Sequence, residues 1–418
     1  MRIRIRKKYL FYLLAFSSAI IASLSAGIDA ITQVYISDPW ALGVACFIFG
    51  VIISLVFTII LSIKIKGKTI GAYSIDPTFK GIRFLKKEEI KPQLLAALGN
   101  SILTVGYFLL LSIYQGNISV VIPFSQAVIL YLVIIESISE KNAPTIIEIQ
   151  SAVIVTFGAI LGSLSIGTNS GSIDIGALAI VFLIINPGWV LLSIYQRKLK
   201  NLKFKNRTND AINIRLWNVI FACIITMIIV SVYDIFSGSN HLLNGIIGVV
   251  NSPILLSLMA VCTFFGFVFY IRALGIGKAS VTQAVRSSII IFSIPVTIVL
   301  SYFGFADPIT TDPVWLLIKL IGIILMLLGI ISFAFTLIKA YIFIQIKPGY
   351  DLEEIMEKLW NIRGVTRVTA VAGTYDFIIK VRIRTLVKGY ERILRKVQEI
   401  PGIRNYKWQS VLKEWEDI

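Results

Sequence analysis

The chain has 418 residues, of which 56% are hydrophobic and only 15% charged, and its mean hydropathy is +0.83. A soluble core cannot use so much apolar surface, so the composition excludes an ordinary cytosolic enzyme, a secreted disulfide scaffold and a disordered chain. The net charge of +17 suggests a nucleic-acid partner at first sight. However, most of the excess Lys and Arg lies between apolar runs, where it orients helices in a membrane. We therefore expect a lipid bilayer and no nucleic acid as partner.

Ten apolar segments are each long enough to cross a bilayer as a helix. They cover about residues 9–34, 39–63, 93–114, 117–137, 148–167, 174–196, 213–235, 251–274, 279–304 and 313–338. Strands of a membrane barrel would alternate in hydropathy over about ten residues, and these segments do not. The sequence therefore predicts an all-α polytopic membrane bundle of ten transmembrane helices.

The charges of the connecting loops predict an orientation. If the basic N-terminus is cytoplasmic, the inside loops hold the Lys and Arg residues, whereas the outside loops hold Asp38, Asp174, Asp307 and Asp312 but no cation. This predicts a plasma-membrane protein with both termini in the cytoplasm. The longest inside loop, 64–92, is basic and amphipathic. It either lies on anionic lipid or acts as a cytoplasmic gate or docking strip.

An internal repeat divides the membrane part into halves, 1–167 and 168–339. Residues 107–119 align without gaps to residues 270–282, and one insertion later Gly158 pairs with Gly322. Each half contains five spans, an odd number, so the halves are inserted in opposite orientations. A 5+5 inverted repeat is typical of secondary transporters.

Residues 340–418 have no apolar run long enough to span. Strand-like segments at 342–346, 365–371, 377–383 and 403–412 alternate with amphipathic helices that begin after Asp351 and cover 387–400. This β-α-β-β-α-β order predicts a C-terminal α+β domain of the ferredoxin-like type.

The membrane part resembles the drug/metabolite transporter superfamily, specifically its EamA type with ten transmembrane helices. The two aligned segments carry the resemblance, together with the Gly-spaced helices at 158–162 and 322–329. Most members have a Pro in helices 4 and 9. Here Pro123 and Pro295 occupy different positions of the repeat, and Arg286 aligns with Pro123.

The C-terminal part resembles the effector domain of Lrp/AsnC regulators, also called the RAM domain. The carrying residues are the turn at 347–349, the 373–377 segment and Ile400-Pro401-Gly402-Ile403. The resemblance implies a homodimer formed through the sheets and an amino-acid site near the turn of Gly373, Thr374, Tyr375 and Asp376. Asp376 either caps that turn or helps to bind an amino group, and Gly373 is expected to need a positive φ. The DNA-binding part of that family is absent here.

Polar residues inside apolar spans are costly, so they are candidates for substrate binding. The candidates, with two aromatic neighbours, are Asp29, Asn100, Tyr107, Gln126, Asn186, Trp189 and Arg286. Arg286 could hold a carboxylate, reach the membrane interface or pair with a carboxylate on a neighbouring helix. Asp29 could bind an ammonium group, relay a proton or face an outer cavity.

The other candidates also allow two interpretations. Asn100 and Gln126 either contact substrate or form interhelical hydrogen bonds. Asn186-Pro187-Gly188 either opens helix 6 toward a ligand or forms a kink for packing. Trp189 and Tyr107 line the cavity or pack between helices. The single histidine, His241, is expected in a loop and cannot form a metal site alone.

No motif for covalent catalysis, metal binding or a phosphate loop is present, so we expect no enzyme and no cofactor. The sequence favours a secondary transporter, an exporter of amino acids or related metabolites, regulated by amino-acid binding to its cytoplasmic domain. Two alternatives stay open. One is a membrane receptor without transport, and the other is a drug or metabolite exporter whose C-terminal domain only dimerises.

Overall fold

The computed structural model describes residues 7–114, 117–139, 146–163, 175–204, 207–306, 312–335, 338–362, 364–383 and 389–410. The chain divides into two compact units, 1–132 with 153–330 and 133–152 with 331–418. Asp174 and Asp307 of the predicted outside loops lie outside the described residues, as does Lys141, one of the basic residues expected in the inside loops.

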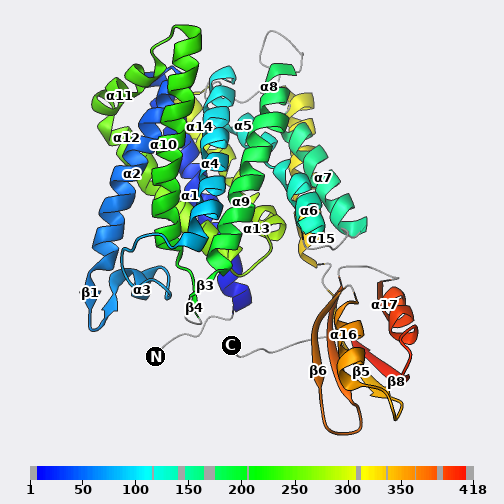
Figure 1. The fold of residues 1–418 in the computed structure, drawn as a ribbon. Coiled ribbons are helices and arrows are strands. Elements are labelled where there is room, and N and C mark those ends of the chain that lie inside the picture. The colour runs from blue at the N-terminus through cyan, green and yellow to red at the C-terminus, as the bar shows by residue number, and fades with distance from the viewer. Residues whose placement is uncertain are drawn as a thin grey trace. The chain divides into compact units, whose positions relative to one another are not determined.

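The described part up to residue 335 is helical (Figure 1). Its helices are α1 (Lys7–Tyr35), α2 (Pro39–Ser62), α3 (Ile70–Ser74), α4 (Lys87–Ile113), α5 (Ile118–Ser125), α6 (Val128–Ser139), α7 (Ile146–Ser163), α8 (Ile175–Ala179), the π-helical η1 (Ile180–Ile185), α9 (Asn186–Asn201), α10 (Ala211–Ser237), α11 (His241–Asn251), α12 (Pro253–Leu274), α13 (Ala279–Arg286), α14 (Ile289–Tyr302) and α15 (Pro313–Phe335). Two short hairpins follow α2 and α9: β1 (Lys64–Ile65) with β2 (Lys68–Thr69), and β3 (Lys203–Phe204) with β4 (Arg207–Thr208).

Seven of the described helices are long and apolar enough to cross a membrane. They are Tyr9–Tyr35, Pro39–Ser62, Lys87–Ile113, Ile180–Asn201, Ala211–Ser237, Pro253–Leu274 and Ala279–Tyr302. Shorter apolar helices, Val121–Glu136, Ile149–Gly158 and Leu316–Gly329, lie within the other three predicted segments. These lengths fit a membrane part.

Two pairs of helices pack most extensively, α1 against α12 and α4 against α9, while α2 lies against α10 and α12. Glycine allows the close approach of α4 and α9. A Cβ added to Gly99 would lie 2.6 Å from the Gly188 carbonyl oxygen, and one added to Gly188 would lie 2.9 Å from that of Gly99. The glycine of the Asn186-Pro187-Gly188 segment therefore serves packing, and the π-helical η1 leads into α9 directly before it.

His241 corrects one expectation, because it begins helix α11 instead of lying in a loop. Its backbone N–H and that of Leu242 donate to the carboxylate of Asp234, which satisfies two free donors at the start of the helix. The His241 Nδ1 lies 2.5 Å from Asp38 Oδ2, and Asp38 also caps α2. The imidazole is therefore fixed between the beginning of α2 and the end of α10.

The C-terminal domain contains the strands β5 (Ile338–Ile346), β6 (Val365–Ala370), β7 (Phe377–Ile383) and β8 (Ile403–Ser410) and the helices α16 (Leu352–Trp360) and α17 (Gly389–Gln398). The sheet is antiparallel, in the order β6-β7-β5-β8. Asp351 caps α16 as predicted. Strand β5 begins four residues before the predicted strand, because Ile338 to Ile344 all pair with β7.

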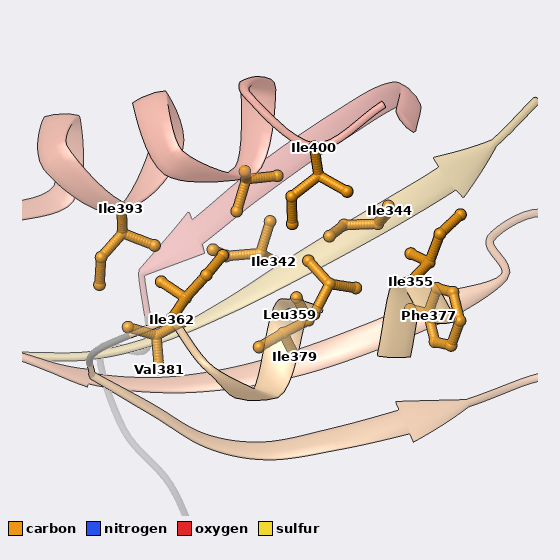
Figure 2. Close-up of a cluster of buried hydrophobic side chains, with 11 residues drawn as sticks. Ile342, Ile344, Ile355, Leu359, Ile362, Phe377, Ile379, Val381, Ile393 and Ile400 are labelled. Atoms are coloured by element: carbon orange, nitrogen blue, oxygen red, sulfur yellow. The ribbon is translucent and has the colours of Figure 1, made fainter. Parts of the chain in front are cut away.

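Alternating apolar residues of the strands form one buried core with the two helices (Figure 2). Ile342 and Ile344 come from β5, Phe377 and Ile379 from β7, and Leu359 from α16, and each is essentially inaccessible. The period of two places every second side chain on this face. The opposite face of the sheet is left for the intervening residues.

Candidate functional site

An arginine–aromatic cluster lies inside the helical part. It consists of Trp189 on α9, Arg215 on α10, Phe267 and Tyr270 on α12, and Arg286 at the end of α13. The rings of Trp189 and Phe267 stack at a centroid distance of 6.1 Å, and the Tyr270 ring meets both edge-on. The Arg286 Cζ lies 4.7 Å from the Trp189 ring centroid and 5.2 Å from that of Tyr270. The Arg215 Cζ lies 4.3 Å from that of Phe267.

Neither arginine has an anionic partner among the described residues. Only 4% of Arg215 and 7% of Arg286 is exposed. Nε and Nη1 of Arg215 and Nε of Arg286 are buried without a hydrogen-bond partner. A buried, unpaired cation costs several kcal/mol, at least about 3, and a desolvated cation–π contact offsets only about 2. The arginines therefore lower stability as the structure stands, which is typical of side chains that bind a ligand.

Beside this cluster, two predicted spans are each interrupted by a short segment that is wound more tightly than an α-helix. Helix α5 ends at Ser125 and α6 begins at Val128, while α13 ends at Arg286 and α14 begins at Ile289. At both places the backbone bonds run from residue i+3 to residue i, as in a 3₁₀-helix. Such a segment within a helix often marks a functional hinge.

The two tightened segments contact each other. Gln126 Oε1 accepts hydrogen bonds from Ser287 Oγ at 2.8 Å and from Gln283 Nε2 at 3.2 Å. All three residues are at most 2% exposed. Gln126 therefore forms an interhelical hydrogen bond, and its partner Ser287 directly follows Arg286 in the chain.

The two tyrosines that the repeat aligns have similar surroundings. Tyr107 lies within electrostatic range of Asp29 on α1, and Tyr270 Oη lies 2.7 Å from Ser193 Oγ on α9. In each case the partner lies on the first span of the same half. The carboxylate of Asp29 and the hydroxyl of Tyr107 interact with each other, and both are buried.

The remaining candidates are also buried. Asn100 Nδ2 donates to Asn218 Oδ1 at 2.9 Å, which joins α4 to α10. Asn186 is fully buried and both its side-chain atoms lack a partner. It follows the π-helical η1, and such segments are frequent at functional sites.

The structure thus brings Trp189 and Arg286 together, and places Asp29 beside Tyr107. Sequence reasoning missed Arg215, Phe267 and Tyr270 as members of the site. One signal was present: Arg215 is a charged residue inside the predicted apolar span 213–235, near the start of its helix. The aromatic partners carried no such signal, since aromatic residues in spans usually pack between helices.

A second set of polar and charged residues lies where the two basic loops, 64–92 and 202–210, meet the helices. We call this set the loop network. It consists of Asp76, Arg83, Glu89, Lys200 and Asn209. Lys200 Nζ donates to Asp76 Oδ2 at 2.7 Å and to the Asn209 carbonyl. Arg83 binds Glu89 through two hydrogen bonds of 2.7 and 2.6 Å. The network therefore ties the 64–92 loop to the end of α9.

The charged residues of the loop network are paired with residues of opposite charge. Burial alone would raise the pKa of Asp76, but the Lys200 ammonium, with hydrogen bonds from Lys200, Ala211 and Thr78, holds it below its ordinary value. The hydrogen bonds and charge of Glu89 raise the pKa of Arg83 despite its burial. Phe79 of the same loop is buried as well, at 1% exposure. This part of the loop is therefore packed onto the helices.

The β6–β7 turn of the C-terminal domain is anchored to β5. Asp376 Oδ2 accepts from the Ile346 N–H at 2.7 Å, and Gln345 Nε2 donates to the Thr374 carbonyl at 2.7 Å. The Tyr375 ring contacts that of Phe343 at a centroid distance of 5.3 Å. Gly373 has a φ of 157°. One oxygen of the Asp376 carboxylate thus ties the turn to the end of β5.

The helix-free face of the sheet is basic and hollowed. A hollow of about 260 Å³ is lined by Tyr341, Arg367, Thr369, Ile378 and Lys380. The Lys380 Nζ lies 5.7 Å from the Tyr341 ring centroid. The face is thus a mixed aromatic and cationic surface.

Comparison with known proteins assigns this domain. Residues 339–417 match the model of the Lrp/AsnC ligand binding domain. The chain carries an Lrp/AsnC ligand-binding domain at its C-terminal end. Domains of this kind bind small amino-acid ligands and often oligomerise. No curated protein matches the chain. A solved structure titled "Crystal structure of protein" covers 77% of this chain and 95% of its own, with 12% identity and a TM-score of 0.44.

Proposed function

We propose that this protein is a secondary transporter, an exporter of amino acids or related small metabolites, regulated by amino-acid binding to its Lrp/AsnC domain. It catalyses no covalent reaction and needs no cofactor. One observation carries the proposal. Arg215, Arg286 and Asn186 are buried between apolar helices of membrane length, and each has side-chain atoms without a hydrogen-bond partner. In a membrane span such groups are expensive and mark the path of a ligand.

Four features support a 5+5 inverted repeat of the EamA type. The first and eighth predicted spans, α1 and α12, pack together, as do the third and sixth, α4 and α9. The aligned tyrosines have equivalent partners in both halves. The fourth and ninth spans change to 3₁₀-type hydrogen bonding within two residues of equivalent positions of the repeat, and these segments meet through Gln126 and Ser287. Ten spans with both termini cytoplasmic fit this arrangement, which provides two near-equal packings for alternating access.

The C-terminal domain supports the regulatory part of the proposal. Its β-α-β-β-α-β order fits a ferredoxin-like fold, and its helix-free face provides a surface for pairing with a second copy. Only two residues separate the end of α15 from β5. A link this short transmits a change in the domain to the last span, whereas a long flexible linker would not.

A membrane receptor is the second candidate. It is favoured by one observation: the family model that matches this chain is that of a ligand-binding domain. In a receptor, the helical part would anchor or sense, and the Lrp/AsnC domain would signal to a partner.

Reconstitution into liposomes separates these functions. A transporter gives flux of at least one amino acid, whereas a receptor binds amino acids and gives none. Regulation is tested on the same full-length protein with Asp376→Asn, which keeps an oxygen for the Ile346 N–H but removes the charge. We expect this variant to lose amino-acid binding to the domain, whereas the matched control Asp351→Asn, at the cap of α16, retains it. Unchanged binding in Asp376→Asn would exclude the carboxylate from the effector site.

A further inference from the structure

We infer that the arginine–aromatic cluster binds a small dianion with two separate acid groups, such as a dicarboxylate. This inference rests on the proposed function, because it names the class of cargo for the same site. A neutral amino acid has one carboxylate and needs one arginine. The structure instead offers two buried guanidinium groups, on α10 and α13, without an anion between them.

The geometry favours two acid groups over one. Arg215 contacts the Phe267 ring, and Arg286 contacts the rings of Trp189 and Tyr270. The two guanidinium groups thus lie over different rings of the cluster, so each can bind a separate acid group. Each presents a planar fork that matches a carboxylate through two hydrogen bonds.

Among the described residues, the groups that interact electrostatically with Arg215 and Arg286 are Cys46 and Tyr270, and neither is a carboxylate. Asp29 is the acidic candidate on the spans, and it lies toward the opposite end of α1 from the basic loops. Arg215 and Arg286 lie within the first eight residues of α10 and α13. Both helices begin at the end that carries the basic loops. The dianion site is therefore nearer the predicted cytoplasmic face, where an exporter loads its cargo.

Binding to the purified full-length protein in nanodiscs tests the inference. Succinate is the main probe, because it has two carboxylates and no ammonium group for an amino-acid sensor to recognise. Aspartate, leucine and phosphate are measured beside it. We expect succinate and aspartate to bind, and each of Arg215→Gln and Arg286→Gln to weaken succinate binding at least about tenfold. The control Arg272→Gln, a half-buried arginine on α12 outside the cluster, retains it.

The result is read together with flux in liposomes. Leucine transport that is unchanged in both arginine variants, without succinate binding, overturns the inference but leaves the transporter standing. Succinate binding that depends on both arginines, without flux of any compound, supports the site and overturns transport. If Arg215→Gln fails to fold, Arg215→Lys replaces it, because it keeps the charge but loses the fork. Undiminished succinate binding in Arg215→Lys and Arg286→Gln contradicts the inference.

Discussion

The loop network and the arginine–aromatic cluster both bury charge, but they do so in opposite ways. In the loop network, Asp76 meets Lys200 and Glu89 meets Arg83, each within 2.7 Å. In the cluster, Arg215 and Arg286 lie over the faces of aromatic rings, and no carboxylate among the described residues pairs with either of them. A buried charge with its counterion holds neighbouring segments together, whereas a buried charge without one destabilises the protein until a ligand arrives. The same kind of residue therefore serves structure in one region and, in the function we propose, binding in the other.

Removing a partner in the loop network should have the largest effect. Lys200→Ala leaves the Asp76 carboxylate buried without its cation. We expect a loss of about 3–5 kcal/mol in the free energy of unfolding, measured as a lower midpoint of thermal unfolding in detergent. Lys198→Ala provides the control, because Lys198 lies on the same helix and is exposed. Equal stability of the two variants would contradict the structural role of the network.

Removing a charge from the cluster should change stability in the opposite direction. Arg286→Met replaces an unpaired cation with an apolar side chain of similar length. We expect the ligand-free protein to gain about 1–4 kcal/mol, with loss of succinate binding. The readouts are the thermal midpoint and binding in the same preparation. A destabilised Arg286→Met protein would mean that the arginine is structural and would remove the contrast between the two regions.

Acid should weaken the loop network through Asp76. Because its pKa in the folded protein is lowered, the stability it contributes is fully present above the unfolded value of about 4 and is lost as pH falls through the lowered pKa. Burial raises the pKa of Asp210, so this neighbour takes up its proton first and opposes the loss. Thermal midpoints from pH 3 to 7 should therefore show the difference between wild type and Asp76→Asn shrinking below about pH 4. A constant difference would contradict a charged Asp76.

A neutral hydrogen bond in the interior should matter least for stability. Ser287→Ala removes one donor to Gln126 Oε1, and we expect a loss of about 1 kcal/mol. Because this bond joins the two tightened helices, flux in liposomes should fall more than stability does. The control is Ser301→Ala, which removes the hydroxyl of a half-buried serine on α14. Flux that falls only in proportion to stability would argue against a hinge at this place.

Local patterns were enough to predict the C-terminal domain. Alternation of apolar residues gave β7 at Phe377–Ile383, and Asp351 marked the start of α16. The strand β5 extends further because pairing with β7 decides its start. Likewise, the helical part followed from hydropathy: among the described residues, seven helices are long enough to span, and shorter apolar helices lie within the other three predicted segments.

The contacts that define the loop network and the arginine–aromatic cluster could not be predicted. In the loop network, Asp76 and Lys200 are 124 residues apart, and no local pattern pairs them. The cluster likewise depends on the packing of α9, α10, α12 and α13. Arg286 could be singled out because a charge in an apolar span is rare. Whether it meets a carboxylate or a ring depends on the neighbouring helices, which only the three-dimensional structure gives.

The imidazole held between α2 and α10 offers an unusual experimental advantage. Because the chain contains one histidine, a single magnetic-resonance signal from isotope-labelled imidazole needs no assignment. That signal reports on the Asp38–His241 contact, at the opposite end of α2 from the loop network. Spectra recorded with and without cargo would therefore reveal whether this end of the bundle opens, in unmutated protein and without any attached probe.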